Sequence, residues 1–114
     1  MEMNVGELGP GLLCVALLGR MDTVGVDQVE ARFTAAVAGS GGGGAAVDLS
    51  AVSFLASMGV RMIIANARAQ RARGHKLVLF GARPLVQSTL EMVALDQIIP
   101  IVPDREQALA RLAG

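Results

Sequence analysis

The segment that decides the fold is Ala45-Ala46-Val47-Asp48-Leu49-Ser50 together with the sequence SMGVRMIIANARAQRAR at residues 57–73. Residues 45–49 form a short apolar run of the kind that a buried β-strand requires. Apolar residues then recur at helical spacing from Ser57 to Arg73, and Gly74 ends the pattern. A buried strand that leads into a long amphipathic helix is typical of α/β proteins.

The first residues of the chain predict a β-hairpin. Two short apolar segments, Asn4–Leu8 and Leu12–Leu18, flank the sequence Gly9-Pro10-Gly11. Pro and Gly this close together indicate a tight turn, and a turn between two short apolar runs joins antiparallel strands.

A helix is predicted between the hairpin and the central segment. Four apolar residues recur at spacings of three and four and therefore share one helix face: Val26, Val29, Phe33 and Val37. Asp22 or Thr23 is expected to cap the first N–H groups of this helix. Gly39–Gly44, with five glycines and one serine, predicts a flexible loop.

The residues after the central segment continue the alternation of strand and helix. Asp104 and Gln107, three residues apart, resemble a capping box at the start of the last helix. The predicted elements are a strand at Lys76–Phe80, a helix at Pro84–Val93, a strand at Ile98–Val102 and a helix at Arg105–Leu112.

This order predicts an α/β fold in one domain, residues 1–114. Alternating strands and helices with continuously apolar strands favour a mostly parallel sheet. We expect four to five strands, an N-terminal antiparallel hairpin strand and about four helices. The glycine-rich loop is too short to separate two domains, because neither side would have a core of its own.

Composition argues against several classes of partner. Ten basic residues balance ten acidic ones, and the chain has three Phe but no Trp or Tyr. It therefore lacks both the global field and the aromatic platforms typical of nucleic-acid binding. The longest apolar run, Leu12–Leu18, is far shorter than a membrane span. The N-terminus does not resemble a signal peptide, and we expect a cytoplasmic protein without direct membrane insertion.

The candidate catalytic residues do not assemble into an active site. His75 is the only histidine and is expected to be a surface residue; Cys14, the only cysteine, is expected to be buried and inert. Asp48 ends an apolar run, but a phosphate-accepting aspartate needs further carboxylates to hold Mg²⁺, and Leu18-Gly19 supplies none. We therefore expect no enzyme activity, no cofactor and no metal.

Four stretches of the chain resemble the STAS domain family, which includes bacterial anti-sigma factor antagonists. Residues 48–60, DLSAVSFLASMGV, resemble its Asp-Leu-Ser strand end and its Asp-Ser-Ser-Gly-Leu helix start. Residues 19–22 look like its Gly-x-Leu-Asp, residues 74–79 like its Gly-x-x-Leu strand, and residues 90–99 like its late helix and final strand. The resemblance covers nearly the whole chain.

The resemblance implies partner switching. In such antagonists the first Ser of Asp-Ser-Ser-Gly, here Ser57, is phosphorylated by a kinase that is also the anti-sigma factor. The unmodified form binds that kinase and frees the sigma factor, and the modified form lets go. This implies an anti-sigma factor/serine kinase as partner, and we expect a monomer or weak homodimer.

Two residues depart from the family pattern. Ala56 stands where the family usually has Asp, and Met58 stands where the second Ser usually lies. The acceptor hydroxyl is kept, but its polar neighbours are lost. A second reading is therefore an accessory subunit of a membrane lipid or anion transport complex, which is bound to an ATPase and never phosphorylated.

The helix at residues 57–73 also predicts a binding surface. Ser57 at its start is by default an N-cap, and a phosphate there would lie beside the positive end of the helix dipole. Val60, Ile63, Ile64 and Ala67 define the predicted core face, whereas Met58, Met62, Ala65 and Ala69 define an opposite, exposed stripe. Asp22 is expected at the same sheet edge as Ser57. The predicted partner-binding residues are Asp22, Ala56, Ser57, Met58, Gly59, Arg61, Met62 and Ala65.

Overall fold

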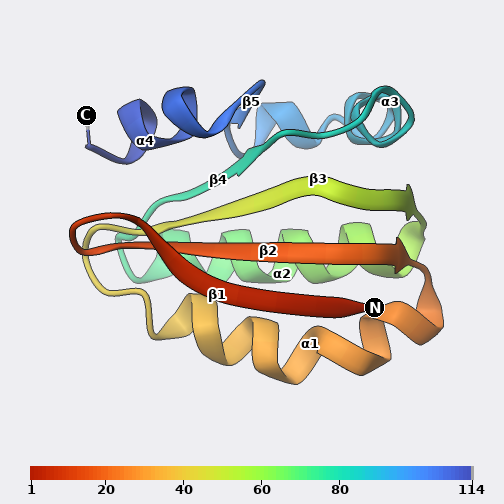
Figure 1. Ribbon diagram of the computed structural model, residues 1–114, viewed down its shortest axis with the longest axis horizontal. Helices are drawn as coiled ribbons and strands as arrows, with labels where there is room; N and C mark the ends of the chain where they lie inside the picture. The colour runs from red at the N-terminus through yellow and green to blue at the C-terminus, as the bar shows by residue number, and fades with distance from the viewer. Residues whose placement is uncertain (114) are drawn as a thin grey trace.

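The computed structural model describes residues 1–113, and their strands and helices follow the predicted order (Figure 1). The strands are β1 (Glu2–Gly9), β2 (Leu12–Met21), β3 (Ala45–Leu55), β4 (Leu77–Phe80) and β5 (Ile101–Val102). The helices are α1 (Thr23–Ala38), α2 (Ser57–Ala72), α3 (Pro84–Met92), a short 3-10 helix η1 (Leu95–Gln97) and α4 (Arg105–Ala113).

The five strands form one mixed sheet in the order β1-β2-β3-β4-β5. β1 pairs antiparallel with β2, and every other pair is parallel, as predicted. The turn between β1 and β2 contains Gly11 at φ 73°, a left-handed conformation that glycine adopts without strain. The sequence therefore predicts the hairpin and the parallel pairing of the remaining strands correctly, whereas the order of the strands within the sheet comes from the structure.

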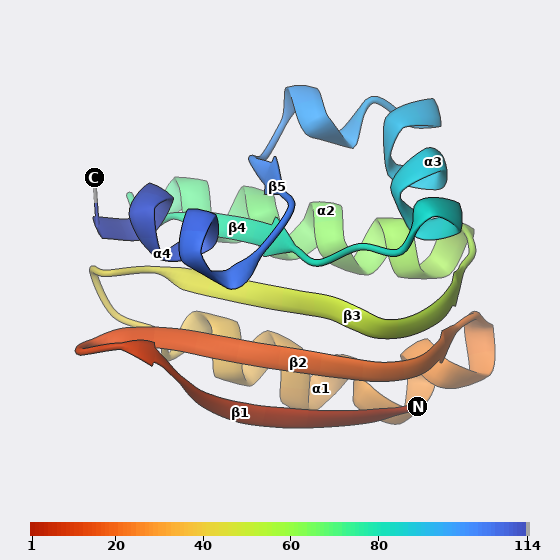
Figure 2. The ribbon, with the colours of Figure 1, turned by 45° about the horizontal axis from the view of Figure 1, so that its top comes forward.

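Helices cover both faces of the sheet, so the strands are apolar on both sides. Helices α1 and α2 lie on one face and α4 lies on the other (Figure 2). Along β4, Leu77 and Leu79 belong to the core beneath α1 and α2, whereas Val78 and Phe80 pack with α4. This alternation explains why β4 is a continuous apolar run, because successive side chains point to opposite faces.

β3 is longer than predicted. We expected a strand at residues 45–49, but β3 continues to Leu55. Its second half pairs with β2 through two register shifts, and the last pair is Met21 with Leu55. The prediction failed because Ser50 and Ser53, which are exposed, interrupt the apolar run although their backbone remains in the sheet.

The last strand is shorter than predicted. Instead of spanning residues 98–102, β5 contains only Ile101 and Val102, and η1 precedes it. Ala94, with φ 55°, turns the chain between α3 and η1, and Ile99 then buries its side chain in the core without joining the sheet. Apolar residues that fill a core from a loop cannot be told from a buried strand by pattern alone.

Within residues 1–113, none of the helices is both long and apolar enough to span a bilayer.

Candidate functional site

Two strand-to-helix corners lie next to each other at the carboxyl edge of the sheet. β2 ends at Met21 and β3 ends at Leu55, and these two residues are register partners. The Ala56 N–H donates a hydrogen bond of 3.0 Å to the Met21 carbonyl oxygen. Asp22 and Ser57, the next residues after these contacts, therefore lie on neighbouring corners, as the parallel topology predicts.

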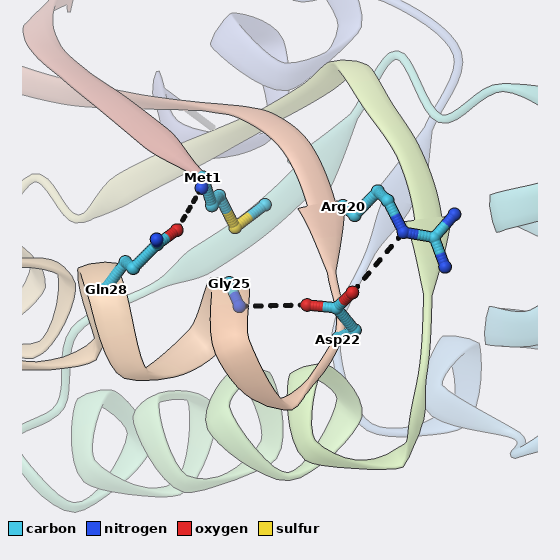
Figure 3. Close-up of polar contacts among 5 residues, drawn as sticks. All are labelled: Met1, Arg20, Asp22, Gly25 and Gln28. Atoms are coloured by element: carbon cyan, nitrogen blue, oxygen red, sulfur yellow. Dashed lines mark hydrogen bonds and ion pairs between the residues drawn. The ribbon is translucent and has the colours of Figure 1, made fainter.

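Asp22 caps α1 through its carboxylate. Its Oδ1 accepts a hydrogen bond of 2.9 Å from the Gly25 N–H, and its Oδ2 lies 3.3 Å from the Arg20 Nε (Figure 3). The Gly25 hydrogen bond and the nearby Arg20 hold the pKa of Asp22 below its ordinary value. A Cβ on residue 25 would lie 2.0 Å from the Arg20 carbonyl oxygen, so this helix start requires glycine.

Ser57 is exposed and is the first helical residue of α2, not its N-cap. The N-cap is Ala56, which has extended backbone angles and makes no side-chain capping bond. The prediction that Ser57 caps the helix is therefore wrong, because a cap must have the non-helical conformation that Ala56 adopts. Within residues 1–113, the Ser57 hydroxyl makes no hydrogen bond.

The N-terminus of α2 has unsatisfied donors. The N–H groups of Gly59 and Val60 donate to the Ala56 carbonyl oxygen at 3.0 and 3.1 Å. Those of Ser57 and Met58 have no acceptor among the described residues, and the first turn holds no acidic side chain. This corner is therefore electropositive, because uncapped N–H groups carry the positive end of the helix dipole.

Arg20 and Phe54 form a feature that sequence reasoning missed. The Arg20 guanidinium lies over the Phe54 ring, 4.4 Å from its centroid, while its Nε contacts Asp22. The two residues are register partners on β2 and β3. The sequence contains no local signal for this contact, because residue 54 lies beyond the predicted strand at residues 45–49 and only the longer β3 brings it beside Arg20.

The predicted exposed stripe of α2 is wrong at Met62. Met62 is 1% exposed and belongs to the core between α1, α2 and the sheet. Gly59 is also buried, and a Cβ there would lie 2.7 Å from Leu55 Cδ1 and 3.1 Å from Met21 Cβ. α2 packs against α1 as well as the sheet, as shown by the hydrogen bond from Asn66 Nδ2 to Thr34 Oγ1. Because α2 packs against both α1 and the sheet, a wider face of α2 is buried than the sheet alone would bury.

The other predicted binding residues of α2 lie on its outer side. Ser57, Arg61 and Ala65 are exposed, and Met58 is half-buried. The Arg61 Nη1 lies 3.8 Å from the Met58 Sδ. Ser57, Arg61 and Ala65 are four residues apart and therefore share one helix face, which borders the two corners.

The other candidate residues lie apart from these corners. Asp48 Oδ1 accepts a hydrogen bond from the Ser50 N–H, and Cys14 is buried. Burial raises the pKa of the Cys14 thiol, although Arg105, whose Nη1 lies 3.8 Å from the sulfur, opposes this. Among residues 1–113, no three His, Cys, Asp or Glu side chains gather where they could hold a metal ion.

The fold and the paired corners define a small α/β domain with an exposed serine at a helix start. The chain belongs to the STAS domain family, whose sequence profile matches residues 7–108. This agrees with the resemblance seen in the sequence.

Individual relatives support the same assignment. BtrV of Bordetella bronchiseptica, which is named as an anti-sigma factor antagonist, is 29% identical over 100 residues, covering 88% of this chain and 85% of BtrV. An anti-sigma factor antagonist from Mycobacterium paratuberculosis superposes with a TM-score of 0.84 at 26% identity, over 99% of this chain and 94% of that one.

The fold also matches the antagonist SpoIIAA. Its unphosphorylated form has a TM-score of 0.70 at 21% identity, over 99% of both chains. Its phosphorylated form, from Bacillus, has a TM-score of 0.71 at 18% identity, over 97% of this chain and 99% of that one.

Proposed function

We propose that this protein is an anti-sigma factor antagonist that binds an anti-sigma factor with serine-kinase activity and releases it when Ser57 is phosphorylated. The observation that carries the proposal is the exposed Ser57 hydroxyl, which caps nothing and can be modified without loss of a structural contact. The names of BtrV and of the Mycobacterium paratuberculosis protein support the antagonist role. SpoIIAA, which has this fold, exists in a phosphorylated form.

The electrostatics of the corner suit a phosphate. A phosphoserine carries about −1.5 to −2 charges at neutral pH. At residue 57 it would lie beside the free N–H groups of Ser57 and Met58, one helical turn from Arg61. These groups stabilise the modified form, so the switch does not require the fold to open.

The same charge would prevent partner binding. The proposed interface consists of the exposed or half-buried residues around the two corners and along the outer face of α2: Arg20, Asp22, Phe54, Ala56, Ser57, Met58, Arg61 and Ala65. A partner that packs against Met58 and Ala65 must remove water from residue 57. Desolvating a dianion is far less favourable than desolvating a hydroxyl, so release follows from phosphorylation.

The second candidate is an accessory subunit of a membrane lipid or anion transport complex that is never phosphorylated. Ala56 favours it, because a methyl group replaces the carboxylate that the family usually places beside the acceptor serine. Neither role requires catalysis by this chain, and the antagonist role places the protein in the cytoplasm with its sigma factor.

An affinity capture with four baits tests the proposal. Wild type, Ser57→Ala, Ser57→Asp and the control Ser53→Asp are exposed to lysate of the native host, and captured proteins are identified by mass spectrometry. Ser53 is an exposed serine on β3, so its substitution adds the same charge four residues away. We expect a small ATP-binding kinase with every bait except Ser57→Asp.

Addition of ATP to the wild-type complex should yield phosphate at Ser57 and release of the kinase. Capture of a transporter ATPase by all four baits alike, without phosphate at Ser57, would show that the second candidate is correct. Phosphate at another serine with unchanged binding would also contradict the switch.

A further inference from the structure

The neutral chain has a strongly uneven charge distribution. Residues 49–90 contain no Asp or Glu, and their six basic residues are Arg61, Arg68, Arg71, Arg73, Lys76 and Arg83. The rest of the chain holds all ten acidic residues and only four basic ones. Overall neutrality therefore conceals a positive region formed by the second half of α2 and the segment that follows it.

A cleft of about 680 Å³ opens in this positive region. It lies between the second half of α2, the start of β4, the connection from η1 to β5 and the end of α4, which Figure 2 shows gathered around β4. α2 begins at Ser57, and Arg71 lies fourteen residues further along the helix. Because an α-helix rises 1.5 Å per residue, the cleft is roughly 20 Å from the Ser57 corner. The cleft is therefore separate from the proposed partner surface.

The lining combines basic and apolar side chains. The basic residues are Arg68, Arg71, His75, Lys76 and Arg111, and no Asp or Glu lines the cleft. The apolar residues are Ala67, Leu77, Val78, Ile98, Ile99 and Pro100, and Gln97 completes the wall.

The basic side chains of the cleft differ in the hydrogen bonds that they make within the protein. Lys76 Nζ donates to the Arg111 carbonyl oxygen at 3.3 Å and so links the residue before β4 to the end of α4. The guanidinium groups of Arg68, Arg71 and Arg111 make no hydrogen bond or ion pair within residues 1–113. His75 Nδ1 is buried without a hydrogen-bond partner in the same part of the chain. Arg68, Arg71 and Arg111 therefore line one cleft, and within residues 1–113 the hydrogen-bonding capacity of their guanidinium groups is unused.

We propose that this cleft binds a small phosphorylated molecule with an apolar or aromatic part. Its volume falls within the range of about 300–1,000 Å³ that is typical of small-molecule sites. Arginine forks bind phosphate oxygens in pairs, so Arg68, Arg71 and Arg111 supply the anion site. Ile98, Ile99 and Pro100 provide the apolar wall for the remainder of the ligand. No step of the proposed partner switch uses these residues.

The charge and shape components can be tested separately with three probes. Naphthyl phosphate carries both the phosphate and the aromatic part, inorganic phosphate carries the charge alone, and naphthol carries the aromatic part alone. Each is titrated into the full chain and followed by proton–nitrogen correlation spectra. We expect naphthyl phosphate to bind most tightly and to shift the amides of residues 75–78 and 97–99.

Two matched variants identify the residues responsible. Arg71→Gln should weaken naphthyl phosphate binding by about ten- to a hundredfold, because it removes a hydrogen bond to a charged group and each factor of ten corresponds to about 1.4 kcal/mol. Arg32→Gln removes the same charge from an exposed position on α1, outside the cleft, and should leave the affinity unchanged.

Four results would overturn the proposal. The first is a dissociation constant above about 1 mM for naphthyl phosphate, and the second is an equal affinity for naphthol and naphthyl phosphate. The third is an equal loss of affinity in Arg71→Gln and Arg32→Gln, and the fourth is a set of amide shifts centred on the Ser57 corner. If an acidic peptide such as oligoglutamate shifts the cleft amides and naphthyl phosphate does not, the cleft is a protein-docking site and the small-molecule assignment is wrong.

Discussion

The Ala56 N–H donates a hydrogen bond of 3.0 Å to the Met21 carbonyl oxygen, and this bond joins the two corners of the candidate site. Met21 precedes the cap of α1, and Ala56 is the N-cap of α2. The starts of both helices are therefore fixed to the same sheet edge. A partner that contacts Ser57 meets the Asp22 corner in a defined position relative to it.

Gly59→Ala should destabilise the fold by about 1–3 kcal/mol, because the new methyl group overpacks the core. Its Cβ would lie 2.7 Å from Leu55 Cδ1 and 3.1 Å from Met21 Cβ, and this outweighs the gain of about 1 kcal/mol that alanine brings to a helix. Urea denaturation measures the change. The control Gly42→Ala, in open space, should change stability little. Equal midpoints for both variants would show that α2 can move away from Met21.

Ala56→Asp should stabilise the protein by about 1 kcal/mol, because it supplies the side-chain cap that α2 lacks. The extended backbone of Ala56, with φ −110° and ψ 176°, already has the conformation of an N-cap. Ala65→Asp adds the same charge on the exposed face of α2 without a capping position and should give no comparable gain. An unchanged urea midpoint for Ala56→Asp would contradict the assignment of residue 56 as the cap.

Ser57→Asp should raise stability by about 0.3–1 kcal/mol at low ionic strength, because a negative charge joins an uncapped helix N-terminus. Ala72→Asp, at the other end of α2, should have the opposite sign. Both effects should shrink as salt screens the charges. A loss of stability for Ser57→Asp would mean that partner release could arise from unfolding, and that the proposed switch is wrong.

Met62→Ala should destabilise the protein by about 2–5 kcal/mol, because it leaves a cavity in a close-packed core. Met62 is 1% exposed, whereas Met58 is half-buried at the corner. Met58→Ala should therefore lose clearly less stability, and it should weaken partner capture instead. If the two variants have equal denaturation midpoints, the phase of α2 must differ from the one described.

Asp22 should make the fold acid-sensitive. Its folded-state pKa is lowered by the Gly25 hydrogen bond and by Arg20. Such a group contributes stability that is fully present above the unfolded pKa of about 4 and is lost as the pH falls through the folded pKa. Asp22→Asn keeps a capping oxygen but cannot titrate.

Thermal melts of wild type and Asp22→Asn between about pH 7 and about pH 2.5 measure this contribution. The difference between the two curves should be constant at neutral pH and should move in favour of the variant in acid. A pH-independent difference would show that the Asp22 carboxylate does not sense the helix start.

The sequence alone determined the fold class, the order of strands and helices along the chain, and the phase of α1. The core face formed by Val26, Val29 and Phe33 is evident from its period, because α1 buries one narrow stripe. The Asp22 cap was also predictable, since a carboxylate before a helical pattern has few other roles. The α1 face and the Asp22 cap depend on contacts within a few residues, which a linear pattern records, and the fold class follows from the alternation of strand and helix patterns along the chain.

Only the tertiary structure decided the composition of the site. Met62 is buried because α1 lies beside α2, and Phe54 meets Arg20 because β3 continues past two exposed serines. Within residues 1–113, the Ser57 hydroxyl is free because Ala56 is the N-cap of α2. If the helix began one residue later, Ser57 would be the cap. The basic cleft brings Arg68 and Arg111, 43 residues apart in sequence, into one wall. Contacts between distant segments follow from packing geometry, and the spacing of residues along the chain does not encode them.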